Sequence, residues 1–335
     1  MSMNDIASLA PTVGTANGRS AEDLRRRDEL VREVDRVMAE KGWSKAEAAR
    51  RSGAGHGTFS QWHTGTYKGR YDTVNATIST WLANIGQVEE VAASVPVSPP
   101  YLPLQFSTSV ERMISIAQIM GTMVMVTADA GIGKTTSASE FVRTRANAYL
   151  ATMSPETGST HNMLAEIAAT IGVEERNASR LVRSIAKRLA RNGDGTVLII
   201  DEAQNLSDDA INQLRHFVDN PACRCGIALL GNAATYARFA RWGKDEKYGQ
   251  LTRRIFKRIK ASRPTADDLA TFIDAWGITD PAQVSFLVGV GMKPGALGQV
   301  DMTIKLARMV AQGKGNELTL EDLRAAWSNR DVELG

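Results

Sequence analysis

One segment of this sequence limits its possible folds more than any other. The apolar run Met123–Thr127 is typical of a buried strand, and a glycine-rich loop, Ala128–Thr135, follows it directly and leads into a helical pattern. A strand, a loop ending in Gly-Lys-Thr and a helix form the context that a phosphate-binding P-loop requires. The segment therefore predicts a nucleotide-binding α/β domain.

The residue types of this loop match the chemistry of phosphate binding. Gly131 and Gly133 let backbone N–H groups turn toward phosphate oxygens, and the helix N-terminus adds the positive end of its dipole. Lys134 can reach the β- and γ-phosphates, and the Thr135 hydroxyl can bind Mg²⁺. The pattern departs from the usual one only in its first position, where Ala128 replaces glycine. The residues expected to hold the nucleotide are Ala130, Gly131, Ile132, Gly133, Lys134, Thr135 and Thr136.

Two further apolar strands end in polar side chains. Thr196–Ile200 precedes Asp201 and Glu202, and Gly226–Leu230 precedes Gly231 and Asn232. A carboxylate at a strand tip beside a P-loop can hold the hydration shell of Mg²⁺, which we assign to Asp201. Glu202 can orient or deprotonate the attacking water. Asn232 can hydrogen-bond that water or the γ-phosphate, although Gly-Asn is also a common turn sequence.

A basic segment, Leu251–Arg263, contains no acidic residue. One of its arginines can act as a finger that enters the ATP site of a neighbouring subunit, which implies an oligomer with active sites at its interfaces. Lys257 and Lys260 are candidates for contacts with DNA phosphates. The alternative is a solvated basic strand or helix.

The N-terminal part contains a pattern typical of a helix-turn-helix of the Cro/repressor type, formed by Trp43–Gly53 and Thr58–Trp62. Ala46, Ala49, Phe59 and Trp62 are its expected core. Candidates for DNA contacts are Thr58, Ser60 and Gln61 for base edges, and Lys68 and Arg70 for phosphates. The alternative is a helical protein-interaction domain with the same core.

A second basic face is expected on a helix near Ala178–Ala190. The spacing of Arg180, Arg183, Lys187 and Arg191 places them on one side of the helix, opposite an apolar stripe. Such a face suits a phosphate backbone. Solvated surface is an equally good interpretation of it.

These segments predict an AAA+ α/β fold, a parallel sheet flanked by helices, with an N-terminal helix-turn-helix domain and a small helical C-terminal domain. Four of the chain's ten prolines lie between Val95 and Pro103 and indicate a linker. The expected divisions are a disordered leader at 1–27, the helix-turn-helix domain at 28–86, the linker at 87–104, the ATPase domain at 105–263 and the C-terminal helices at 264–335.

Composition adds few constraints. The net charge of +3 is too small to indicate a nucleic-acid binder by itself. The N-terminus has no secretory signal and no apolar run is long enough for a membrane span, so we expect a cytoplasmic protein, in the host cell if a phage encodes it. Cys223 and Cys225 are expected to be reduced thiols.

The motifs together resemble the phage Mu B protein family, the AAA+ target-selecting ATPases of transposition. The resemblance includes Gly131–Thr135, Ile200–Ala203, Gly231-Asn232, Leu251–Arg258 and, as its most specific part, Gly291–Leu297. It implies a protein that binds ATP with Mg²⁺ and forms helical filaments on duplex DNA with little sequence preference. It also implies a partner, a DDE transposase, which the filament activates and which stimulates ATP hydrolysis.

Two residue assignments follow from this resemblance. The family pattern after Leu251 falls on Arg254, which is therefore the expected arginine finger. The family has an arginine after Gly-Ala-Leu, the sensor-2 position, where this chain has Gly298. We therefore expect no arginine contact to ATP from the C-terminal domain, and slow hydrolysis.

Two alternatives remain open from the sequence. A helicase loader of the DnaC or IstB kind would assemble with a helicase and prefer single-stranded DNA. A transcriptional regulator with ATP as a ligand would use its helix-turn-helix to bind a defined operator with high sequence specificity.

Overall fold

The computed structural model describes residues 20–193, 195–242 and 253–330. Two positions of the basic segment, 251 and 252, lie outside these ranges. The chain divides into two compact units, with the boundary between Val95 and Pro96. None of the helices in the described ranges is long and apolar enough to cross a lipid bilayer.

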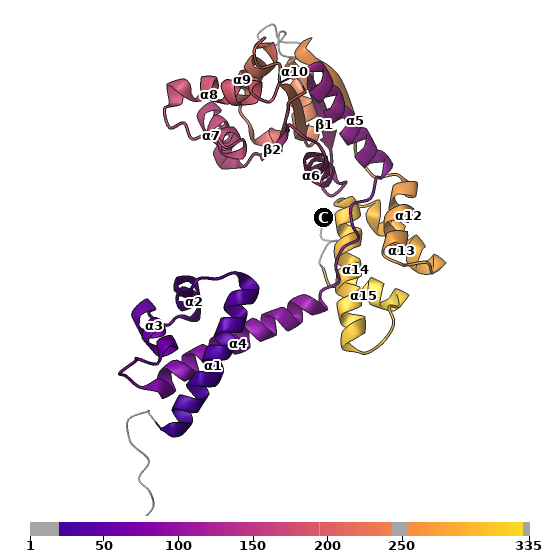
Figure 1. The fold of residues 1–335 in the computed structure, drawn as a ribbon. Helices are drawn as coiled ribbons and strands as arrows, with labels where there is room; N and C mark the ends of the chain where they lie inside the picture. The colour runs from indigo at the N-terminus through magenta and orange to yellow at the C-terminus, as the bar shows by residue number, and fades with distance from the viewer. Residues whose placement is uncertain (1–19, 194, 243–252, 331–335) are drawn as a thin grey trace, which may run out of the picture. The chain divides into compact units, whose positions relative to one another are not determined.

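The first unit is helical (Figure 1). Its helices are α1 (Ala21–Lys41), α2 (Lys45–Ser52), α3 (His56–Thr64) and α4 (Tyr71–Ser94). Ser20 begins α1 with a capping box, in which its side chain accepts from the Asp23 backbone and the Asp23 side chain accepts from the Ser20 backbone. The expected leader of residues 1–27 was therefore too long. The linker expected from residue 87 also begins too early, since α4 continues to Ser94.

Helices α2 and α3 are joined by a short turn in which Gly53 adopts φ 74°. Phe59 and Trp62 of α3 are buried as expected, and the Trp62 indole N–H donates to Asn75 Oδ1 at 2.8 Å. Ala46 is exposed, contrary to expectation, because α2 turns the adjacent pair of alanines, Ala48 and Ala49, into the core. The assignment of these helices as a DNA-binding helix-turn-helix stays a prediction.

The second unit is built on a parallel sheet with the strand order β2-β3-β4-β1-β5. Its strands are β1 (Met123–Ala128), β2 (Ala148–Thr152), β3 (Val197–Asp201), β4 (Gly226–Gly231) and β5 (Ile255–Ala261). Side chains of the central strands β1, β3 and β4 alternate between two hydrophobic clusters, one on each face. This double burial explains the nearly continuous apolar runs in these strands.

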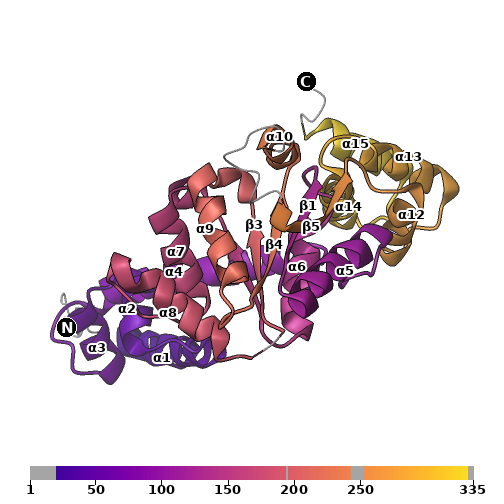
Figure 2. The same cartoon turned by 90° about the horizontal axis from the view of Figure 1, so that it is seen from above.

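Helices cover both faces of this sheet. Figure 2 shows α5 and α6 on one side and α7, α8 and α9 on the other. The covering helices are α5 (Gln105–Met120), α6 (Lys134–Thr144), α7 (Thr160–Thr170), α8 (Ala178–Ala190), α9 (Asp208–Asp219) and α10 (Ala233–Trp242). The carboxyl ends of β1, β3 and β4 all lie at one edge of the sheet, so the polar residues that follow them come together there.

The C-terminal helices form their own hydrophobic core. They are α12 (Ala266–Ala275), α13 (Pro281–Gly291), α14 (Ala296–Gly313) and α15 (Leu320–Ser328). Leu104 from the expected linker is buried in this core, and the N–H of Gln105 donates to Asp268 Oδ1 at 2.7 Å. The chain just before α5 is therefore packed against the C-terminal helices and is not a free spacer.

Candidate nucleotide site

The P-loop has the geometry that its glycines predict. Gly131 and Gly133 adopt φ 78° and 108°, in the left-handed region that glycine enters without a Cβ clash, and α6 begins immediately after Gly133. The Lys134 ammonium is buried and donates to the carbonyl oxygens of Ala128 at 2.5 Å and Asp129 at 3.0 Å. Burial lowers the pKa of Lys134, while the carboxylates of Glu202, Asp201 and Asp129 oppose this shift.

The tip of β3 lies against the start of α6. The Thr135 hydroxyl donates to Asp201 Oδ2 at 2.5 Å, and the N–H of Glu202 donates to Asp201 Oδ1 at 2.9 Å. Asp201 is fully buried, so both its oxygens are held in place. A hydroxyl and a carboxylate beside a phosphate cradle suit Mg²⁺, which keeps several waters and binds substrate phosphates. Within the described ranges no cluster of three or more His, Cys, Asp or Glu side chains offers a metal site made of protein ligands alone.

The catalytic candidates Glu202 and Asn232 are linked through a third residue. Gln204 Nε2 donates to Glu202 Oε2, and Gln204 Oε1 accepts from the N–H of Asn232 at 3.3 Å. Asn232 Oδ1 accepts the N–H of Ala234 at 2.9 Å, so its side-chain carbonyl caps α10. The turn-forming and sensing interpretations of Asn232 are thus compatible, because its amide NH₂ remains as a donor.

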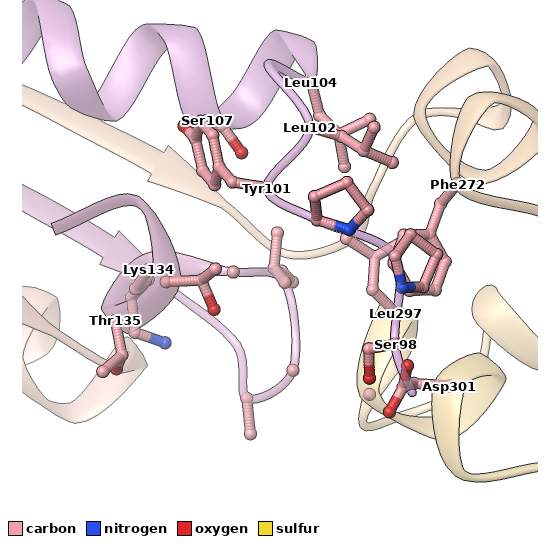
Figure 3. Close-up of a pocket in the computed structure, with 18 of the residues that line it drawn as sticks. Ser98, Tyr101, Leu102, Leu104, Ser107, Lys134, Thr135, Phe272, Leu297 and Asp301 are labelled. Carbon is pink, nitrogen blue, oxygen red and sulfur yellow. The ribbon is translucent and has the colours of Figure 1, made fainter. Parts of the chain in front are cut away.

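A cavity of about 480 Å³ opens over the P-loop. Figure 3 shows its walls: Tyr101, Leu102 and Leu104 at the top, Phe272 and Leu297 on the right, and Lys134 with Thr135 on the left. We call Ser98–Leu104 the strap. Its apolar side chains suit a nucleoside, while the P-loop offers donors to phosphates. Sequence reasoning assigned the strap to a linker and missed this role. The available signal was that an aromatic side chain and two apolar ones, Tyr101, Leu102 and Leu104, follow the first prolines.

Tyr101 anchors the strap to α5. Its hydroxyl contacts the Glu111 carboxylate. Burial, and then the hydrogen bond with Glu111, raise the pKa of Tyr101 to about 12. The phenol is therefore neutral at physiological pH and stays a hydrogen-bond donor to that carboxylate.

The C-terminal domain contacts the P-loop through backbone atoms. The N–H of Gly298 donates to Gly131 O at 3.2 Å. A Cβ placed on Gly131 would lie only 1.9 Å from Gly295 O. Gly298, at the expected sensor-2 position, lines the cavity without offering a charged group.

The expected finger, Arg254, lies at the other end of the sheet. Ile255 pairs with Met123 at the start of β1, whereas the P-loop follows the end of that six-residue strand, roughly 20 Å away. Arg254 forms an ion pair with Asp219 at 2.9 Å and remains more than half exposed. It cannot reach its own P-loop, so a role in catalysis requires a second subunit.

The DNA-contact candidates separate into several surfaces. Arg180, Arg183 and Lys187 on α8 and Arg191 at its C-cap are all exposed, and the opposite face of the helix is buried as expected. Lys257 and Lys260 are exposed on β5 but point to opposite faces of the sheet, since they are three positions apart in a strand whose side chains alternate. They do not form one phosphate-binding face.

In the first unit, only some of the DNA-contact candidates on α3 are exposed. Gln61 is exposed, whereas Thr58 and Ser60 are half-buried. Lys68 is exposed, and Arg70 is paired with Asp72 at 2.6 Å. In the second unit, Cys223 and Cys225 are buried free thiols, as expected.

Fold and site together define an AAA+ P-loop protein. Residues 120–239 match the family described as "AAA domain". Among solved structures, the chain is similar to ORC2 of Aeropyrum pernix (TM-score 0.56, 15% identity, 70% of each chain covered). It is also similar to Cdc6p of Pyrobaculum aerophilum (TM-score 0.55, 14% identity, 73% and 71% covered). At these identities the likeness concerns the fold alone.

Within this class the chain is similar to the phage Mu B transposition proteins. Residues 253–329 match the family "Mu B transposition protein, C terminal". The chain is 28% identical over 290 residues to the "ATP-dependent target DNA activator B" of Escherichia phage Mu, covering 86% of this chain and 90% of that protein. It is 26% identical over 273 residues to the "Mu-like prophage FluMu DNA transposition protein B" of Haemophilus influenzae, covering 80% and 92%. These findings confirm the resemblance expected from the motifs.

Proposed function

We propose that this chain is an ATPase of DNA transposition, which assembles on duplex DNA when it binds ATP and delivers that DNA to a DDE transposase. The observation that carries the nucleotide part is the hydrogen bond between Thr135 and the buried Asp201 beside Lys134 and Glu202. The names of the relatives, an ATP-dependent target DNA activator and a transposition protein, support the part concerning DNA.

The residues divide the hydrolysis step among them. The P-loop N–H groups and Lys134 bind the phosphates, and Thr135 and Asp201 would hold Mg²⁺, whose charge stabilises the transferring phosphoryl group when it is bound. Glu202 takes a proton from water while the water oxygen bonds to the γ-phosphorus and ADP leaves. Asn232 donates to the γ-phosphate or to the water. Arg254 of one subunit enters the site of the next.

Assembly into a filament is the property that separates this proposal from its alternatives. The test is electron microscopy of the chain with random-sequence duplex DNA, with ATP and Mg²⁺ and without nucleotide. Regular filaments only with ATP support the proposal. Closed rings that prefer single-stranded DNA favour the helicase loader, and dimers restricted to one operator sequence favour the transcriptional regulator.

A single variant separates assembly from hydrolysis. In Glu202→Gln we expect filaments to form with ATP and to persist, because binding is kept while proton transfer is lost. Phosphate release should fall by about 10²-fold or more. Rapid turnover in this variant would show that another group is the base.

A further inference from the structure

We propose that Gln204 is a positioning residue, which orients the Glu202 carboxylate and couples it to the tip of β4. This inference rests on the proposed role of Glu202 as the base. Gln204 lies in the short 3₁₀ turn Ala203–Asn205 that follows β3, and it does not line the nucleotide cavity. It therefore acts through Glu202 and not on the nucleotide.

Both ends of the Gln204 amide are used. Its NH₂ group donates to Glu202 Oε2, and its carbonyl accepts from the N–H of Asn232 at 3.3 Å. A flipped amide would place its oxygen against a carboxylate and its NH₂ against an N–H donor, so the two partners fix its orientation. One amide group thus connects the tip of β3 to the tip of β4.

The turn that carries Gln204 is itself fixed to α10. Arg238 donates to the backbone oxygens of Gln204 at 3.1 Å and Leu206 at 2.5 Å. At the end of β4, a Cβ on Gly231 would lie 3.2 Å from Gln204 Oε1 and 2.3 Å from Thr235 Oγ1. Glycine at this position leaves the room that lets the glutamine side chain reach β4.

This arrangement has a consequence for catalysis. With Oε2 held by Gln204, the other oxygen of Glu202, a residue that lines the cavity, is left to take a proton. A base held in one orientation does not have to be ordered during the reaction, which lowers the barrier. Because Asn232 is attached to the same amide, a shift of the β4 tip on contact with phosphate reorients Glu202. Gln204 thereby links the sensing of ATP to its hydrolysis.

The test compares Gln204→Glu with the wild type in the full-length chain with duplex DNA, ATP and Mg²⁺. The substitution keeps an acceptor for the Asn232 N–H but replaces the donor to Glu202 with a second anion. We expect kcat to fall at least about tenfold while ATP affinity stays within about twofold. Gln204→Met, which removes both contacts, should also lower kcat while ATP affinity stays within about twofold.

Asn205→Asp is the matched control. It makes the same change from amide to carboxylate one residue further along the turn, where Asn205 Nδ2 donates to Met153 O at 2.8 Å and not to Glu202. It should lower kcat less than Gln204→Glu does. Equal losses of kcat in Gln204→Glu and Asn205→Asp would indicate a structural role and overturn the proposal.

The Glu202→Gln variant separates failure of this inference from failure of the proposed function. If Glu202→Gln stops hydrolysis and Gln204→Glu behaves as the wild type, Gln204 has no positioning role and the base assignment stands. If Glu202→Gln hydrolyses ATP at the wild-type rate, the base assignment is wrong and the role of Gln204 falls with it.

Discussion

At the scale of single residues, the site depends on a few positions with no freedom to change. Asp201 is fixed by two hydrogen bonds, and Lys134 is buried against two carbonyl oxygens. Gly131 is fixed by the approach of the C-terminal domain. Substitutions at Lys134 and Gly131 therefore have measurable effects.

Lys134→Ala should abolish ATP binding and ATP-dependent assembly on DNA together, because the phosphates lose the only ammonium that the described P-loop offers. Calorimetric titration with a non-hydrolysable ATP analogue measures the binding. Circular dichroism confirms that the fold is retained. ATP-dependent filaments in this variant would contradict the assignment of the P-loop.

Gly131→Ala should disrupt both the P-loop and its contact with Gly295. Alanine is strained at φ 78°, and its Cβ would overlap a carbonyl oxygen. We expect the free energy of unfolding to fall by about 1–3 kcal/mol and nucleotide affinity to fall with it. Gly298→Ala is the control, since its Cβ meets only Gly131 Cα at 3.6 Å. In a helix it should raise stability by up to about 1 kcal/mol. Equal thermal melts for both variants would contradict this interpretation.

At the scale of elements, the sequence predicted β1, β3, β4 and α8 of the second unit, whereas it left the segment of β5 open between a strand and a helix. The apolar runs before the P-loop and before Asp201 are strands buried on both faces, for which composition alone is a sufficient signal. The network of Gln204 was not predictable, because it depends on the side-by-side placement of β3 and β4 tips that are far apart in sequence. The strap was missed because prolines indicate an extended chain without saying what packs against it.

The basic face of α8 permits a test of DNA binding at this scale. In Arg183→Glu we expect weaker binding to duplexes of any sequence. The slope of log binding constant against log salt concentration should also become smaller by about one unit, as for the loss of one phosphate contact. Fluorescence anisotropy over a range of salt concentrations measures both. Arg324→Glu, on an exposed position of α15, makes the same charge change and is the control. Identical behaviour of the two variants would show that α8 is solvated surface.

At the scale of the whole molecule, the boundary between Val95 and Pro96 separates two units with their own cores. The strap belongs to the second unit, because Leu104 is buried among the C-terminal helices. A fragment that starts at Pro96 therefore retains the complete wall of the nucleotide cavity.

This fragment should bind DNA more weakly than the full-length chain does. It should still form ATP-dependent filaments, since the nucleotide site and Arg254 are both retained. Filament formation is checked by microscopy, and affinity by anisotropy with the same duplex. Complete loss of assembly in a fragment that still binds ATP would show that the first unit is part of the polymer contact.

The backbone contact between Gly298 and Gly131 implies reciprocal linkage. A ligand that moves the P-loop must also move the start of α14, because no flexible side chain lies in that hydrogen bond to absorb the displacement. Any neighbour that holds the C-terminal helices in one orientation will then change nucleotide affinity, and nucleotide will change the affinity for that neighbour by the same factor. Titrating nucleotide at increasing protein concentration measures this factor as a change in nucleotide affinity.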